Sequence, residues 1–148
     1  MNKDIYASIK ERPEYSKYLY RYGFLITTSE QALEEKCFIL KSWHHSIIGK
    51  FSFWIHPDQK LYTYAANGIT FFLIGHCYNP FTMTVGESDA LSALAAAFQN
   101  NVDAYCEELS DLTGIFMTGY IADNSITIYG DAAGMFMTYY GFANACIW

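Results

Sequence analysis

The sequence has no lysine or arginine after Lys60, although the chain is 148 residues long. All nine basic side chains lie in residues 1–60, together with seven of the fifteen acids, and residues 61–148 hold the other eight acids. Nucleic acids and anionic membranes are bound through clusters of Lys and Arg that neutralise phosphates. We therefore expect neither a nucleic acid nor a membrane as a partner.

Long apolar runs are also missing. The chain contains no continuous stretch of about 18 apolar residues, the length that spans a bilayer. Residues 1–6, MNKDIY, lack the hydrophobic core of a secretory signal. These absences predict a cytoplasmic protein.

Cysteine and histidine are sparse and scattered. Cys37, Cys77, Cys106 and Cys146 form no Cys-x-x-Cys pair, so their spacing gives neither a zinc motif nor a disulfide framework, and we expect buried free thiols. A metal could recruit His44, His45, His56 and His76 together with Cys77. However, adjacent histidines on a strand point to opposite faces. We predict no metal site and no cofactor.

The residues that are present favour one globular domain over residues 1–148. The composition is 52% hydrophobic, 18% aromatic and 16% charged, which excludes disorder and leaves few charges to cover the surface. Thirteen tyrosines and eleven phenylalanines fit either a tyrosine-rich core or an interface with a partner. Both interpretations stay open.

Local patterns predict an α+β fold. We expect strands at 20–28, 37–43, 50–56, 60–66, 69–75, 113–122, 125–130 and 134–141, and helices at 3–19, 29–36, 89–100 and 102–109. Ser88 is the expected N-cap of the third helix. Turn residues at 56–59 and at Asn67-Gly68 predict two antiparallel hairpins.

The strand at 113–122 is apolar on both faces, since Ile115, Met117 and Ile121 alternate with Phe116 and Tyr120. A sheet buried on both faces needs a second sheet on one side and helices on the other. The sequence therefore predicts a layered architecture.

Four segments, in order, resemble the glutaminase domain of class II glutamine amidotransferases, and most closely the asparagine synthetase branch. Residues 71–79, FFLIGHCYN, are similar to the family's strand ending in Asn-Gly-Glu-Ile-Tyr-Asn. Residues 86–89, GESD, resemble the Ser-Asp that opens a helix, and residues 109–116, LSDLTGIF, resemble the Leu-x-Gly-x-Phe strand entry. Residues 130–140, GDAAGMFMTYY, are similar to the Arg-Asp-x-x-Gly-x-x-Pro-Leu-Tyr hairpin.

The resemblance implies an N-terminal-nucleophile hydrolase-like αββα sandwich with two stacked antiparallel sheets. It also implies that this domain is the N-terminal part of a longer asparagine synthetase-like protein. Residues 1–70 match poorly beyond being strand-rich, and whether residues 1–19 belong to the fold stays open.

The resemblance also implies a catalytic nucleophile, and this sequence lacks it. In this family an N-terminal cysteine attacks the glutamine amide and its own α-amino group acts as the base. Here Met1 is followed by Asn2, and the first cysteine is Cys37. We therefore predict no catalytic residues. Cleavage before Cys37 would create a new N-terminal cysteine but would also remove the strand expected at 20–28.

The glutamine-binding pocket that the resemblance implies is also incomplete. The family's oxyanion hole pairs an Asn side chain with the N–H of the next Gly, and the corresponding residues here are Ile74 and Gly75. Losing one such donor costs about 10² to 10³ in rate in other enzymes. No Arg lies between residues 42 and 60 to bind the glutamine carboxylate. Gly75 and Asp89 remain as vestigial substrate-binding residues, although for Asp89 the pattern favours an acid in the first turn of a helix over a substrate contact.

These observations predict a non-catalytic glutamine amidotransferase-like domain with a structural or regulatory role beside an ATP-dependent, amide-forming synthetase domain. Its expected partner is that C-terminal synthetase domain or a second copy of the chain. One alternative is an active glutaminase that supplies ammonia through displaced residues. The other is a module that binds a small amino acid without chemistry.

Overall fold

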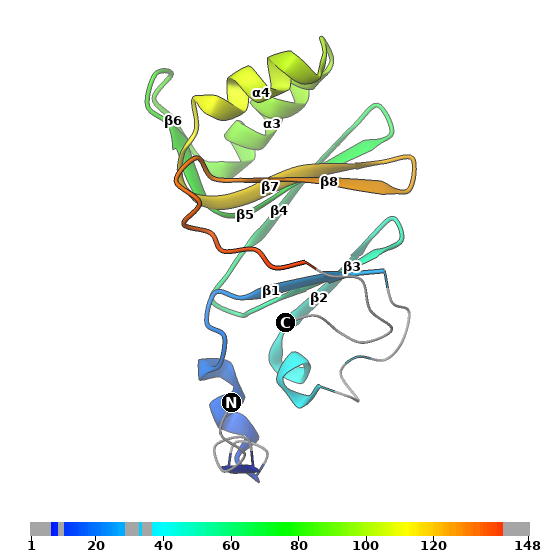
Figure 1. The fold of residues 1–148 in the computed structure, drawn as a ribbon, viewed down its shortest axis with the longest axis vertical. Helices are drawn as coiled ribbons and strands as arrows, with labels where there is room; N and C mark the ends of the chain where they lie inside the picture. Colours follow the sequence, from blue (N-terminus) through cyan, green and yellow to red (C-terminus); the bar gives the residue numbers. More distant parts are fainter. Residues whose placement is uncertain (1–6, 9–10, 29–32, 34–36, 141–148) are drawn as a thin grey trace. The chain divides into compact units, whose positions relative to one another are not determined.

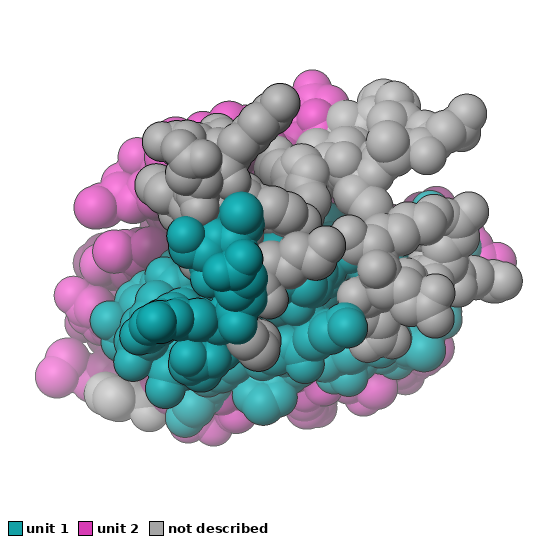
Figure 2. Space-filling view, turned by 90° about the horizontal axis from the view of Figure 1, so that it is seen from below, with its two compact units in different colours: residues 1–60 teal, residues 61–148 magenta. Residues whose placement is uncertain are grey.

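A computed structural model describes residues 7–8, 11–28, 33 and 37–140 of the chain. The chain divides into two compact units, residues 1–60 and residues 61–148 (Figure 2). This boundary coincides with the boundary of charge, since Lys60 is the last basic residue. Each unit therefore has its own electrostatic character.

The first unit contains a three-stranded antiparallel sheet in the order β1-β3-β2, formed by β1 (Phe24–Thr27), β2 (His44–Ile48) and β3 (Phe51–Ile55). Of two 3₁₀ helices, η1 (Pro13–Tyr18) precedes β1 and η2 (Phe38–Ser42) lies between β1 and β2 in the sequence. Gly49, at φ +59°, turns the chain between β2 and β3. A small core forms around Trp54 and the apolar residues Leu33, Cys37, Ile39 and Leu40.

The second unit contains an antiparallel sheet in the order β4-β5-β7-β8, and β6 pairs with the end of β5. The strands are β4 (Leu61–Ala66), β5 (Ile69–Asn79), β6 (Thr84–Val85), β7 (Thr113–Ala122) and β8 (Ser125–Gly130). Two helices, α3 (Glu87–Phe98) and α4 (Val102–Ser110), lie on one face of this sheet (Figure 1). The unit is thus a helical layer packed on a sheet.

The core of the second unit lies between this sheet and these helices. Phe71 and Leu73 of β5 pack with Leu91 and Leu94 of α3 and with Tyr105 of α4, and all five are at most 1% exposed. Full burial of each such side chain contributes roughly 1.5–3 kcal/mol. The opposite face of the sheet is buried too, since Phe72, Ile74 and Met117 have no exposed surface. The sheet is therefore apolar on both faces, as the alternation in residues 113–122 predicts.

The α+β class with antiparallel sheets is confirmed, and most of the expected elements of the second unit are present. The Asn67-Gly68 hairpin joins β4 to β5, with both residues at positive φ. The helices expected at 89–100 and 102–109 are α3 and α4, and one face of α3 is buried at Leu91, Leu94 and Ala95. In α4, Tyr105 is buried and Cys106 is exposed.

Two predicted strands are wrong. Residues 38–42 form the helix η2, because a short apolar run without alternation fits a buried helical turn as well as a strand. Residues 131–140 form no strand, because the Asp131 carboxylate binds the N–H groups of Ala133, Met135 and Phe136 that a strand would use for pairing. No strand was predicted at β2, which begins at His44.

Two further expectations need correction. The turn at 56–59 does not join a hairpin, because β3 and β4 belong to different sheets. Helix α3 begins at Glu87 after Gly86, so Ser88 is not its N-cap. Of the helix expected at 3–19, η1 covers residues 13–18, while residues 1–6 and 9–10 lie outside the described residues. The helix expected at 29–36 also lies outside them, apart from Leu33.

Candidate functional site

The polar side chains nearest to the predicted glutamine-binding pocket lie at the end of β5. Nδ1 of His76 lies 2.9 Å from Oε1 of Glu87, the first residue of α3. Burial raises the pKa of Glu87, but the hydrogen bond to His76 and other contacts outweigh it, so the net pKa is lowered. The pKa of Tyr62 on β4 is raised, first by burial and then by the Glu87 carboxylate. Glu87 is therefore a carboxylate that two neighbouring polar side chains stabilise.

Gly75 lies in β5 directly opposite Phe116 of β7. Its φ is +112°, and a Cβ at this position would lie 2.3 Å from the Ile115 carbonyl oxygen. The two strands approach so closely there that only glycine fits. Packing therefore explains Gly75 without a ligand. The neighbouring Ile74 is fully buried.

Asp89 lies in the first turn of α3 and is exposed. Its carboxylate lies over Gly86, since a Cβ there would be 3.4 Å from Asp89 Oδ2. Within the described residues, no hydrogen bond or ion pair joins Asp89 to β5, and Glu87 makes that connection instead. The structure does not assemble Gly75 and Asp89 into one polar site.

Cys77 is 6% exposed, and burial together with the Glu87 carboxylate raises the pKa of its thiol to about 12. At neutral pH this sulfur is a thiol, not a nucleophilic thiolate. Cys37 is buried as well, in agreement with the expectation of buried free thiols, whereas Cys106 is exposed on α4. Cys146 lies outside the described residues.

Two buried polar residues organise the loops around the end of β5 and the end of β8. Asn79 accepts hydrogen bonds from the backbone N–H of Phe81 at 2.9 Å and of Thr82 at 3.2 Å. Burial raises the pKa of Asp131, but four backbone N–H groups of residues 133–136 outweigh it and the net pKa is lowered. Both residues lie in the matched motifs, but the hydrogen bonds that their side chains accept from the backbone were not predicted.

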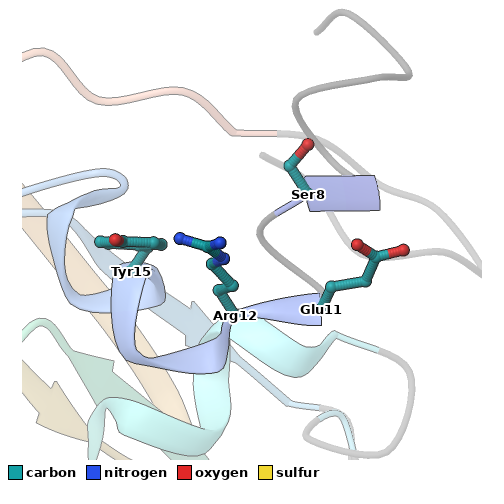
Figure 3. A pocket seen from close by; sticks show the side chains of 4 residues that line it. All are labelled: Ser8, Glu11, Arg12 and Tyr15. Carbon is teal, nitrogen blue, oxygen red and sulfur yellow. The ribbon is translucent and has the colours of Figure 1, made fainter.

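An open hollow of about 370 Å³ lies in the first unit and is lined by Ser8, Glu11, Arg12 and Tyr15. Figure 3 shows the Arg12 side chain turned towards Tyr15 and the Glu11 side chain turned away from both. The Arg12 guanidinium carbon is 6.0 Å from the centre of the Tyr15 ring. The hollow includes neither Gly75 nor Asp89.

Across the part of the chain that the structure describes, no three His, Cys, Asp or Glu side chains gather as metal ligands would. In the same residues, every helix is too short or too polar to cross a bilayer. Comparison of the chain with protein-family models, with curated proteins and with solved structures finds no match.

Proposed function

We propose that the chain is a non-catalytic glutamine amidotransferase-like domain. It has a structural or regulatory role beside an asparagine synthetase-like domain that forms amides with ATP. The proposal includes an N-terminal-nucleophile hydrolase-like αββα arrangement and a cytoplasmic location. It rests on the resemblance of residues 71–79, 86–89, 109–116 and 130–140 to that family.

The proposal that the domain is non-catalytic rests on the burial of Ile74 and the close packing at Gly75. The residue that corresponds to the oxyanion-hole asparagine is an isoleucine without exposed surface. At Gly75 of β5 an added Cβ would lie 2.3 Å from the Ile115 carbonyl oxygen, so the close approach of β5 and β7 accounts for this glycine. An oxyanion hole needs donors aimed at an accessible reacting atom, and this pair supplies no side-chain donor.

The thiol nearest to this pair supports the same proposal. Cys77 is two residues from Gly75, buried, and protonated at neutral pH because its pKa is about 12. It therefore cannot substitute for the missing nucleophile. An antiparallel sheet with two apolar faces and helices on one of them is also consistent with a layered amidotransferase-like fold.

The test is incubation of the full chain with an electrophilic glutamine analogue, followed by intact and peptide mass measurement and an assay of glutamate release. The Cys106→Ser variant is the matched control, because Cys106 is an exposed thiol that reacts without a specific site. We expect no analogue on C106S and no glutamate. Stoichiometric labelling of a new N-terminal cysteine would instead establish an active glutaminase.

A second measurement separates the proposal from an amino-acid-binding module. Glutamine that bound the folded chain would raise its thermal midpoint. We expect no shift with glutamine in the wild type. A shift that Asp89→Asn abolishes, without glutamate release, would overturn the proposal in favour of a binding module.

A further inference from the structure

The β5–β6 loop, residues 80–83, presents large apolar side chains to solvent. Phe81 is 77% and Met83 78% exposed, and Tyr78 at the base of the loop is 48% exposed. The loop is held in shape by Asn79, which is 2% exposed and binds the N–H groups of Phe81 and Thr82. A rigid loop with an apolar tip loses little conformational freedom when it binds.

Two acidic residues, Glu108 and Asp111, lie near the base of this loop. Nδ2 of Asn79 donates to Oε1 of Glu108 at 3.4 Å. Asp111 lies two residues before Thr113, which pairs with Tyr78. Since residues 61–148 contain no Lys or Arg, two such loops would repel each other. A partner must therefore offer apolar surface together with positive charge.

Residues 12–22 of the first unit, which we call the tyrosine–cation surface, combine exposed aromatic side chains with three cations, Arg12, Lys17 and Arg21, and one acid, Glu14. Its exposed aromatic side chains are Tyr15, Tyr18, Tyr20 and Tyr22, which are 43 to 64% exposed. Arg12 lies over the Tyr15 ring, and the Lys17 amine is 5.1 Å from the centre of the Tyr18 ring. Among the described residues neither cation forms an ion pair, whereas Arg21 is paired with Asp58.

Backbone strain singles out the same two surfaces. Six non-glycine residues in the described part of the chain have positive φ, and three of them are the turn residues Asn67, Asp123 and Asn124. The other three are Tyr20, Tyr22 and Met83, side chains for which this conformation is unfavourable. Strained backbone of this type gathers at recognition sites.

We propose that the β5–β6 loop of one copy of this chain docks on the tyrosine–cation surface of a second copy. The apolar side chains Phe81 and Met83 contact the exposed tyrosine rings, and Glu108 and Asp111 approach Arg12 and Lys17. This inference stands on the two surfaces and does not depend on the proposed function.

The first test is sedimentation velocity of the full chain up to about 1 mM. We expect concentration-dependent association that weakens as NaCl rises from about 0.05 M to about 0.5 M. Phe81→Ser/Met83→Ser and Arg12→Glu/Lys17→Glu are each expected to weaken association about tenfold or more. The matched control is Ile47→Ser, which removes a 69% exposed apolar side chain from β2 and should leave association unchanged.

A mixing experiment distinguishes specific docking from non-specific association. F81S/M83S lacks a functional loop but keeps the tyrosine–cation surface, and R12E/K17E has the opposite defect. Each variant alone should associate about tenfold or more weakly than the wild type, and an equimolar mixture should form one-to-one pairs at concentrations at which neither variant associates alone. Circular dichroism and thermal unfolding verify that both variants are folded.

Three results would overturn the docking proposal. A wild-type chain that stays monomeric over this range, or a mixture of the two variants that forms no pairs, would overturn the proposal. A monomeric chain that floats with phosphatidylcholine–phosphatidylglycerol vesicles, but not as F81S/M83S, would assign the loop to a lipid surface instead.

Discussion

The imidazole of His56 joins two distant segments of the first unit, with Nε2 2.8 Å from the carbonyl oxygen of Lys17. Its other nitrogen, Nδ1, accepts from the backbone N–H of Asp58 at 3.0 Å. The side chain is 1% exposed, and Nε2 carries the proton that is donated to Lys17. One buried histidine therefore attaches η1, and with it part of the tyrosine–cation surface, to the end of β3.

Replacement of His56 by alanine should destabilise the chain by about 1–3 kcal/mol, because a carbonyl and an N–H would lose their partner in a buried site. Urea unfolding followed by tryptophan fluorescence measures this change. His44→Ala is the control, since His44 is exposed on β2 and its loss should cost less than about 0.5 kcal/mol. Equal stability of the two variants would contradict the attachment role.

Asp131→Asn should destabilise the turn after β8 and should flatten the dependence of stability on pH. The folded pKa of Asp131 is lowered, so its contribution is complete above the unfolded value of about 3.9 and is lost as pH falls through the folded pKa. Urea midpoints at pH 7 and near pH 3 test this. Asp123→Asn, in the exposed β7–β8 turn, is the control for the loss of a surface carboxylate, and its cost in stability at pH 7 should be less than about 0.5 kcal/mol.

Cys77 should resist alkylation in the folded chain. With a pKa of about 12, its thiolate is roughly three orders of magnitude rarer at pH 7.5 than that of a thiol with ordinary pKa. A short iodoacetamide pulse followed by peptide mapping should find Cys106 modified and Cys77 unmodified until urea is added. Rapid labelling of Cys77 without denaturant is the result that would contradict its burial.

Gly75→Ala should cost about 2 kcal/mol or more, because the new Cβ would lie 2.3 Å from the Ile115 carbonyl oxygen in a strand at φ +112°. Gly130→Ala is the matched control, since a Cβ at Gly130 meets nothing within 4 Å. Thermal unfolding of the two variants compares them directly. If G75A were as stable as G130A, the close approach of β5 and β7 would not explain this glycine.

The second unit was largely predictable because its signals are local. Asn67-Gly68 specifies a two-residue hairpin by its tolerance of positive φ, and the spacing of Leu91, Leu94 and Ala95 specifies one face of α3. The first unit was less predictable. Sequence alone cannot show that His56 binds Lys17 across 39 positions, nor that β3 pairs with β1 instead of β4.

The candidate site was predictable in its position along the chain but not in its chemistry. Gly75 and Asp89 were singled out by resemblance, yet the structure buries one in a strand contact and leaves the other on the surface. Glu87 was passed over because a glutamate at a helix start is ordinary. Its contact with His76 depends on how α3 packs against β5, which is a tertiary property.

The left-handed backbone at Met83 lowers stability at a residue that contacts the second copy in the proposed docking. A glycine there would remove a penalty of about 1–2 kcal/mol for a side chain in this conformation. The chain has an exposed methionine at this position and therefore lacks this extra stability. A Met83→Gly variant should therefore unfold at a higher temperature and associate more weakly, as expected of a position where stability is exchanged for function.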